Sequence, residues 1–159
     1  MGNKEWSQLW LRYKKVEKKY DYDFENFYIK DFNKGNPVIG SIISEYKKGI
    51  SELLGINEDN IKLLDEKDDK TKGVIFSKNE GVLVEGFEIQ VSNVIDIKAS
   101  DEKGLLYGLF HLLRLIARGI DLEDLNIRKN PSSKLRMLNH WDNMDGSIER
   151  GYSGQSFFF

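Results

Sequence analysis

The chain has 159 residues, of which 40% are hydrophobic and 31% are charged, which is enough for one domain with its own core. Its 24 basic and 26 acidic residues are mixed along the chain, and the absence of a basic excess argues against a nucleic-acid-binding protein. The absence of cysteine excludes disulfides, thiolate metal sites and thiol catalysis.

The sequence predicts a protein that neither enters nor crosses a membrane. No apolar stretch approaches the roughly 20 residues that a membrane-spanning helix needs. The opening letters, MGNKEWSQLW, have no apolar run or cleavage pattern of a signal peptide. A cytoplasmic location is therefore expected.

The first third of the chain predicts a strand and a helix. Residues 6–16 favour a short helix, and the aromatic-rich run at residues 24–32 favours a strand. Asn36 is a suitable N-cap and Pro37 fits the first helical position. Apolar residues then recur at helical spacing until Gly55, so a long helix is expected between these points.

The middle of the chain predicts short strands. Apolar runs at residues 61–64, 74–76 and 82–84 are separated by charged or glycine-containing turns, and the charged tract at 65–72 predicts a solvated loop. Apolar and polar residues alternate at 87–91 and again at 95–99. Ser92 and Asn93 between these two runs indicate a hairpin turn, so the two strands should be antiparallel neighbours.

A second apolar helix is expected after Ser100, its predicted N-cap, and before Gly119, its predicted C-cap. His111 lies on this Leu-rich helix, where a packed or hydrogen-bonded histidine is expected. Linker-like sequence begins at Asp121. The elements together predict an α+β fold: a two-layer domain with a mixed, largely antiparallel sheet and two main helices.

The segment NHWDNMDGSIERGY, residues 139–152, concentrates polar and aromatic side chains. An EF-hand calcium-binding loop is not expected. Trp141 and Tyr152 would hold its first and last ligand positions, and neither can supply the required carboxylate. Zinc is not expected, since the chain offers only His111 and His140 and no cysteine. Ser147 lacks a nucleophile elbow, and the glycine spacing matches neither a P-loop nor a dinucleotide fingerprint. No metal or cofactor is predicted.

The remaining chemistry is that of a sugar site. The apolar face of a pyranose can pack on the indole of Trp141, while its hydroxyl and carboxylate groups bind neighbouring polar side chains. These neighbours are Asp142, Asn143, Asp145, Glu149 and Arg150. The alternative interpretation is a polar loop whose tryptophan fills a domain interface, and the residues alone leave both open.

Three stretches resemble one family in the right order. LRMLNHWDNMDGSIERGYSG, residues 135–154, closely resembles the segment that opens the catalytic barrel of family 67 α-glucuronidases. WLRY at 10–13 resembles the start of the family's N-terminal domain, and EGFEI at 85–89 with GLLYGLFHLLRLI at 104–116 resembles its hairpin and helix. The last pattern is also similar, more loosely, to N-terminal domains of hexosaminidase-like enzymes.

The resemblance implies an N-terminal α+β domain at 1–130, followed at 131–159 by the start of a (β/α)8 barrel with its first strand at 135–140. Such enzymes hydrolyse the α-1,2 bond between (4-O-methyl)glucuronic acid and xylose in xylo-oligosaccharides, with inversion and without a metal. The family's catalytic carboxylates lie on later barrel strands. No catalytic residue is therefore assigned here, and the 159-residue chain alone is expected to be inactive.

The resemblance carries substrate-binding roles onto five residues. The family's matching tryptophan lines the glucuronate pocket, so Trp141 is predicted to contact substrate. The other four fall inside the matched motif: Asp142, Asn143, Glu149 and Arg150. The expected partner is a glucuronic-acid-decorated xylo-oligosaccharide, and a homodimeric parent enzyme stays open. The alternative is a free-standing carbohydrate-binding or interaction module without catalytic activity.

Overall fold

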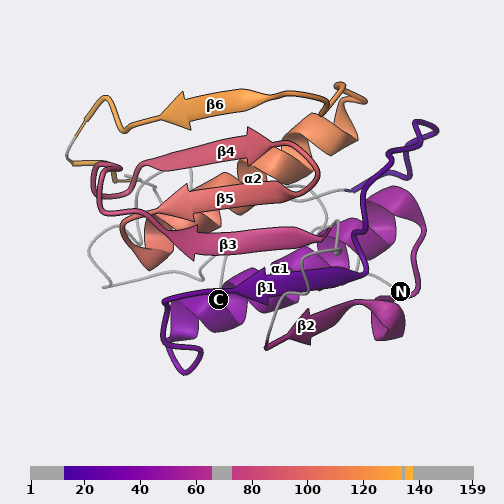
Figure 1. Ribbon diagram of the computed structural model, residues 1–159, viewed down its shortest axis with the longest axis horizontal. Coiled ribbons are helices and arrows are strands. Elements are labelled where there is room, and N and C mark those ends of the chain that lie inside the picture. Colours follow the sequence, from indigo (N-terminus) through magenta and orange to yellow (C-terminus); the bar gives the residue numbers. More distant parts are fainter. Residues whose placement is uncertain (1–12, 66–72, 134, 138–159) are drawn as a thin grey trace, which may run out of the picture.

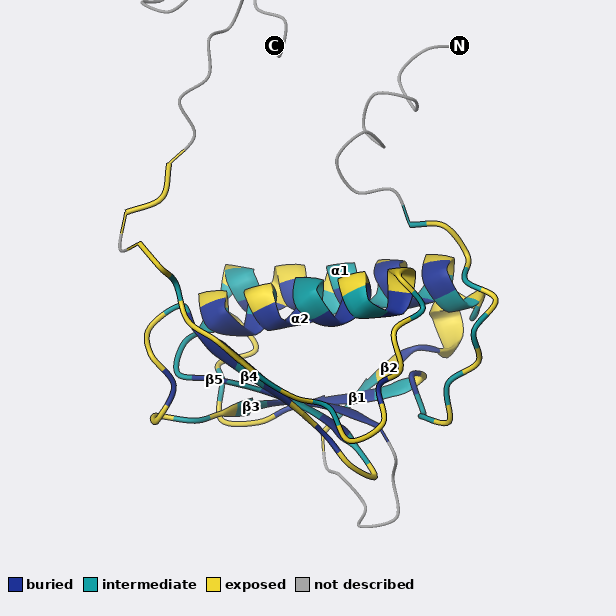
Figure 2. Cartoon of the chain, turned by 90° about the horizontal axis from the view of Figure 1, so that it is seen from above, coloured by how far each residue is buried: buried dark blue, intermediate teal, exposed yellow. Residues whose placement is uncertain are grey.

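A six-stranded sheet with two helices on one of its faces forms the described part of the protein (Figures 1 and 2). This computed structural model describes residues 13–65, 73–133 and 135–137. The elements in chain order are β1 (Asn26–Ile29), α1 (Pro37–Leu54), the 3₁₀ turn η2 (Glu58–Asn60), β2 (Lys62–Leu64), β3 (Val74–Lys78), β4 (Phe87–Val91), β5 (Ile95–Ala99), α2 (Glu102–Ala117) and β6 (Asn126–Lys129). The predicted two-layer α+β class is confirmed.

The sheet is mixed, with the strand order β2-β1-β3-β5-β4-β6. The pairs β1–β2, β1–β3 and β3–β5 are parallel, whereas β4–β5 and β4–β6 are antiparallel. The expectation of a largely antiparallel sheet is therefore wrong in its proportions. For β1 and β2 the reason is the crossover through α1, since a helix between two neighbouring strands returns the chain in the same direction.

Helix α1 begins and ends where the sequence predicts. The Asn36 side chain accepts a hydrogen bond from the Val38 amide at 2.8 Å, Pro37 occupies the first turn, and Gly55 ends the helix with φ of 70°. The buried face of α1 includes Ile42 and Tyr46. The Tyr46 hydroxyl donates to the Phe24 carbonyl at 3.0 Å, and burial raises its pKa well above the ordinary value.

Helix α2 begins one residue later than predicted. Its N-cap is Asp101, whose side chain accepts from the Gly104 amide at 3.0 Å, and not Ser100. Aspartate and serine are both strong N-caps, so neighbouring candidates cannot be separated from sequence alone. At the other end the C-cap is Arg118 and not the predicted Gly119, which follows it with a left-handed φ of 64°, as a glycine just past a helix often does.

The core lies between the helices and the sheet, and Figure 2 shows their buried sides facing each other. Alternate residues of β4 and β5, such as Ile89 and Ile97, are fully buried and lie beside the apolar face of α2. The hairpin predicted from this alternation is confirmed, with Val91 paired to Ile95 across the turn.

Two short segments differ from their predicted structures. Residues 82–84 form turns and no strand, because Asn79 accepts from the Gly81 and Val82 amides and Leu83 accepts from Gly86. The linker expected from Asp121 contains strand β6 instead, which pairs with β4 as an edge strand.

Two predictions fall partly outside the described residues. Residues 13–16 of the helix expected at 6–16 are not helical, and the rest of that segment lies outside the described residues. Residues 135–137 belong to no strand, and 138–140 also lie outside. The barrel strand expected at 135–140 and the domain boundary near residue 130 therefore stay predictions.

Candidate functional site

The predicted substrate-binding residues lie outside the part of the chain that the structure describes. They are Trp141, Asp142, Asn143, Glu149 and Arg150. The structure does describe the segment that leads to them, as far as Met137. It also describes the N-terminal part of helix α2, which that segment contacts.

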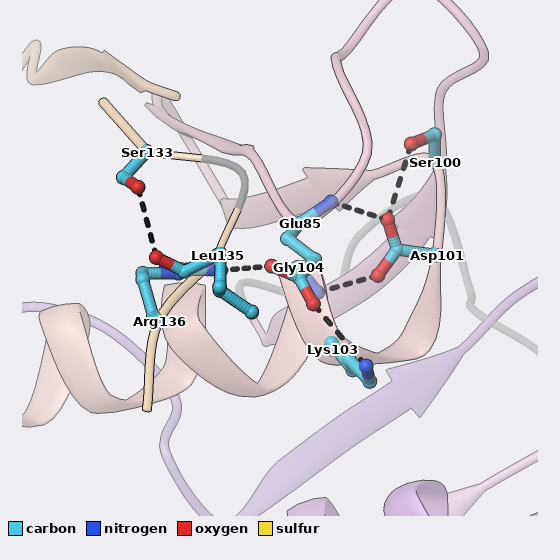
Figure 3. A network of polar contacts seen from close by, with 8 residues as sticks. All are labelled: Glu85, Ser100, Asp101, Lys103, Gly104, Ser133, Leu135 and Arg136. Atoms are coloured by element: carbon cyan, nitrogen blue, oxygen red, sulfur yellow. Dashed lines mark hydrogen bonds and ion pairs between the residues drawn. The ribbon is translucent and has the colours of Figure 1, made fainter. Parts of the chain in front are cut away.

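Arg136 anchors this leading segment to the N-terminal end of α2. Its guanidinium forms an ion pair with Glu85 and lies 5.1 Å from the centre of the Tyr107 ring, a cation–π contact. The Ser133 hydroxyl donates to the Leu135 carbonyl at 2.8 Å. Figure 3 shows the Ser133–Leu135 hydrogen bond and the Arg136–Glu85 ion pair beside the first turn of α2.

Glu85 and Asp101 form the centre of this network. The Glu85 amide donates to Asp101 at 2.6 Å, while the other Asp101 oxygen caps α2 (Figure 3). Glu85 has a left-handed φ of 59°, which points its amide at the cap. The Glu85 carboxylate forms ion pairs with the Lys103 ammonium, at 3.2 Å, and with the Arg136 guanidinium. We call Glu85, Asp101, Lys103 and Arg136 the anchor network.

The anchor network favours an ionised Glu85. Its pKa is lowered, first by the hydrogen bond from Lys103 and further by Arg136, against an opposing effect of desolvation. A general acid in a glycosidase needs a raised pKa, so that it still holds its proton at the working pH. Glu85 is therefore suited to hold the chain in place and unsuited to protonate a leaving group.

Glycines bring the backbone of α2 onto the turn before β4. A Cβ at Gly104 would lie 2.2 Å from the Gly86 carbonyl oxygen and 2.9 Å from the Ala99 Cβ. A Cβ at Gly86 would lie 2.5 Å from the Asn130 side chain. Both glycines belong to stretches that carry the family resemblance, EGFEI and GLLYGLFHLLRLI. In these two stretches the glycines serve close packing.

His111 is packed, as predicted. Its ring centroid lies 5.2 Å from that of Phe87, and its Nδ1 is 3.0 Å from the Arg114 guanidinium. Its pKa is lowered, first by burial and then by the nearby positive charges of Arg114 and Lys129. Among the described residues, no group of three or more histidine and acidic side chains could hold a metal ion.

A hollow of about 550 Å³ opens at the opposite, C-terminal end of α2. Three segments that are distant in sequence line it: residues 18–22, the β4–β5 turn and the α2–β6 connection. The lining residues are Lys18, Lys19, Tyr20, Asp21, Tyr22, Ser92, Asn93, Asp121, Glu123 and Asp124. Sequence reasoning missed this hollow, because separate polar loops look solvated until the fold brings them together.

Two models of one family match the chain in consecutive order. The N-terminus of glycosyl hydrolase family 67 matches residues 9–112, and the middle domain of the same family matches residues 115–159. The family predicted from the sequence motifs is confirmed.

Curated relatives of the chain are named alpha-glucuronidase A. The chain is 44% identical over 77 residues to a probable alpha-glucuronidase A of Aspergillus terreus, and 40% identical over 76 residues to the alpha-glucuronidase A of Aspergillus tubingensis. These alignments cover 48% and 47% of this chain and 9% of each relative. The chain thus aligns with a small part of the length of these relatives.

Solved structures show only a distant likeness. A beta-N-acetylhexosaminidase from Bacteroides fragilis has a TM-score of 0.43 at 18% identity, covering 64% of this chain and 17% of that chain. A GH20 exo beta-N-acetylglucosaminidase from Vibrio harveyi has a TM-score of 0.39 at 18% identity, covering 57% of this chain and 12% of that one. Scores this low carry no argument about function.

Neither α1 nor α2, nor any other helix in the described residues, has the length and apolar content needed to cross a bilayer. The N-terminus model alone covers residues 9–112, which is more than half of the chain. The chain belongs to glycosyl hydrolase family 67, with residues 9–112 matching the family's N-terminus and residues 115–159 matching its middle domain.

Proposed function

We propose that this chain is the N-terminal part of an α-glucuronidase that hydrolyses the α-1,2 bond between (4-O-methyl)glucuronic acid and xylose in xylo-oligosaccharides, with inversion. The observation that carries the proposal is the consecutive match of two family 67 models to residues 9–112 and 115–159. Relatives named alpha-glucuronidase A support the same activity.

Inverting hydrolysis needs two carboxyl groups about 6.5–9.5 Å apart, one that donates a proton to the leaving oxygen and one that activates water. The pKa of Glu85 is lowered by Lys103 and Arg136, and that of Asp121 is lowered by the Glu123 amide and then by Lys18. Neither suits the acid. The family resemblance implies that both catalytic carboxylates lie on later barrel strands, and we assign them there.

The described domain has a supporting role in this proposal. Arg136 lies five positions before Trp141 in the sequence, and Glu85 and Tyr107 hold it against α2. The segment that carries the proposed glucuronate contacts therefore follows a residue that is held against α2. Sites that are supported by packed elements keep their geometry better than sites on free loops.

The test is hydrolysis of aldotriouronic acid by the protein of the full reading frame that contains this chain. That protein should release glucuronic acid with inverted configuration, and Trp141→Ala should lower kcat/KM by roughly 100-fold, or about 2.7 kcal/mol. Gly40→Ala, at an exposed position of α1, is the control and should leave kcat/KM unchanged. An inactive protein, or an unaffected Trp141→Ala variant, would contradict the proposal.

The 159-residue chain alone separates the enzyme from the alternative. We expect no turnover of aldotriouronic acid by it, and turnover above background would show that the carboxylates are misplaced. Saturable binding of glucuronic acid that Trp141→Ala abolishes would favour a free-standing carbohydrate-binding module. The cytoplasmic location and a homodimeric parent enzyme stay predictions.

A further inference from the structure

The hollow at the C-terminal end of α2 has the size of a ligand site. Its volume of about 550 Å³ falls within the range of roughly 300–1,000 Å³ that is common for small-molecule sites. It lies between the segment at residues 18–22, the turn that contains Ser92 and Asn93, and the loop at residues 121–124. Strand β5 and helix α2 separate it from the anchor network, which lies where α2 begins.

The lining combines aromatic rings with hydrogen-bonding groups of both kinds. Both phenols keep their protons at neutral pH, because the ordinary tyrosine pKa is about 10. Burial, and then neighbouring carboxylates, raise the pKa values of Tyr20 and Tyr22 further. Contacts with Phe24 hold both rings, with centroids 6.2 and 6.4 Å from its own. The Tyr20 hydroxyl also donates to the Ile116 carbonyl, at 3.4 Å.

One cation of the hollow is already paired inside it. The Lys18 ammonium lies 3.4 Å from Asp121 and 5.5 Å from the centre of the Tyr20 ring. Since Lys18 lies against the Tyr20 ring, Tyr22 is the ring that remains for a ligand. The built-in ammonium also disfavours a second cation at the same place.

The charge of the lining disfavours anions. Four carboxylates line the hollow against two ammonium groups. The C-terminal end of α2 carries the negative end of the helix dipole, which adds to this potential. A ligand with a carboxylate, such as glucuronate, would be repelled. A neutral ligand rich in hydroxyl groups can both donate to the carboxylates and accept from the lysines and Asn93.

We propose that this hollow binds the neutral part of an oligosaccharide, one or two xylosyl units, apart from the segment that contacts glucuronate. The apolar face of the sugar packs on Tyr22, and its hydroxyl groups bind Asn93, Glu123 and Asp124. The hollow itself favours a neutral ligand rich in hydroxyl groups, the class to which sugars belong. The choice of xylose among neutral sugars rests on the proposed function.

The test is calorimetric titration of the 159-residue chain with xylotetraose. We expect saturable binding with a dissociation constant at or below about 1 mM. Tyr22→Ala should weaken binding at least tenfold, and Asp124→Asn should weaken it several-fold. Asparagine tolerates the left-handed φ of 53° at position 124, so that variant removes the charge without straining the loop. Tyr107→Ala, at the other end of α2, is the matched control and should bind normally.

Competing ligands test the charge argument. Glucuronic acid should not displace xylotetraose, and spermidine should not bind in its place. Displacement by glucuronic acid, or binding of spermidine without binding of xylotetraose, would overturn the proposal. So would the absence of saturable binding up to about 10 mM, or normal binding by both hollow variants. If Tyr22→Ala does not fold, the xylotetraose binding of Asp124→Asn and Glu123→Gln tests the proposal instead, and normal binding by both would overturn it.

This result can be separated from that for the proposed function. Trp141→Ala should leave xylotetraose binding unchanged, because Trp141 belongs to the glucuronate segment in our assignment. Tyr22→Ala in turn should leave the anomeric configuration of the released glucuronic acid unchanged. Failure of xylotetraose binding with intact hydrolysis overturns only the hollow, whereas inactivity with intact binding overturns only the hydrolase.

Discussion

The two ends of α2 differ in how tightly they are built. At the N-terminal end, the backbone of Gly104 lies against that of Gly86, and Asp101 accepts hydrogen bonds from two amides. At the C-terminal end, a Cβ added to Gly119 would meet nothing within 4 Å, and the hollow opens beside it. One helix therefore joins a closed, interlocked region to an open, polar one.

The two ends of α2 are suited to two different purposes. Close backbone contact needs glycine, as at Gly86 and Gly104, and the neighbouring Glu85 forms the ion pair with Arg136. An open end needs polar and aromatic side chains that leave space between them. We infer that the first end holds the glucuronate segment in place and that the second provides room for a ligand.

Gly104→Ala should have the largest effect, because it breaks the closed end. The added Cβ would lie 2.2 Å from a backbone oxygen, which cannot move aside as a flexible side chain could. We expect a loss of roughly 3 kcal/mol in the free energy of unfolding. Urea denaturation followed by circular dichroism measures it.

Gly40→Ala is the matched control for that variant. Gly40 is exposed within α1, with nothing within 4 Å of an added Cβ. Replacing it should stabilise the protein by about 0.5–1 kcal/mol, because alanine loses less entropy in a helix. Similar losses in both variants would contradict the close contact at Gly104.

Asp101→Ala should cost about 2 kcal/mol, because it removes the cap of α2 and leaves the Glu85 amide without its acceptor. Ser100→Ala should cost less than about 0.5 kcal/mol, since its hydroxyl makes only a 3.4 Å contact with Asp101. Urea denaturation of both variants checks the order. An equal or larger loss in Ser100→Ala would restore serine as the cap.

Much of the fold was predictable where the signals are local. Asn36, Pro37 and Gly55 mark both ends of α1, and the alternation in β4 and β5 marks the hairpin. Strand β6 was missed because most of its residues are exposed and only Ile127 packs partly on the core. Edge strands of this kind lack the apolar pattern by which strands are recognised.

The candidate sites were predictable to different degrees. Trp141 and its neighbours could be proposed because a contiguous motif carries the resemblance, and the structure does not describe them. The anchor network and the hollow could not be predicted, because each depends on residues that only the fold brings together. Glu85 and Arg136 are 51 positions apart in sequence.

Gly119→Ala should cost about 1 kcal/mol, because the left-handed φ of 64° strains a residue with a Cβ, although the space around it is open. Gly119→Asn should cost less, since asparagine tolerates this conformation. Thermal or urea unfolding distinguishes the two. A loss as large as that of Gly104→Ala would show that the C-terminal end is also tightly packed.

Glu85→Gln should have the smallest effect, and one that depends on pH. Lys103 and then Arg136 lower the pKa of Glu85 in the folded protein, so its charge stabilises the fold above the ordinary glutamate pKa of about 4.3. That contribution is lost as the pH falls through the lowered pKa. The urea midpoints of the two proteins should differ slightly at about pH 7 and converge once the pH has fallen below the lowered pKa of Glu85. A gap that widens in acid would contradict this assignment.

The most direct test of the difference between the two ends is chemical-shift mapping of the isotope-labelled chain with xylotetraose. We predict that the amide signals of Tyr22, Asn93 and Asp124 shift progressively and saturate, while those of Asp101 and Gly104 stay in place. Shifts centred on Asp101 and Gly104, or no shifts at either end, would contradict the assignment of a ligand site to the open end of α2.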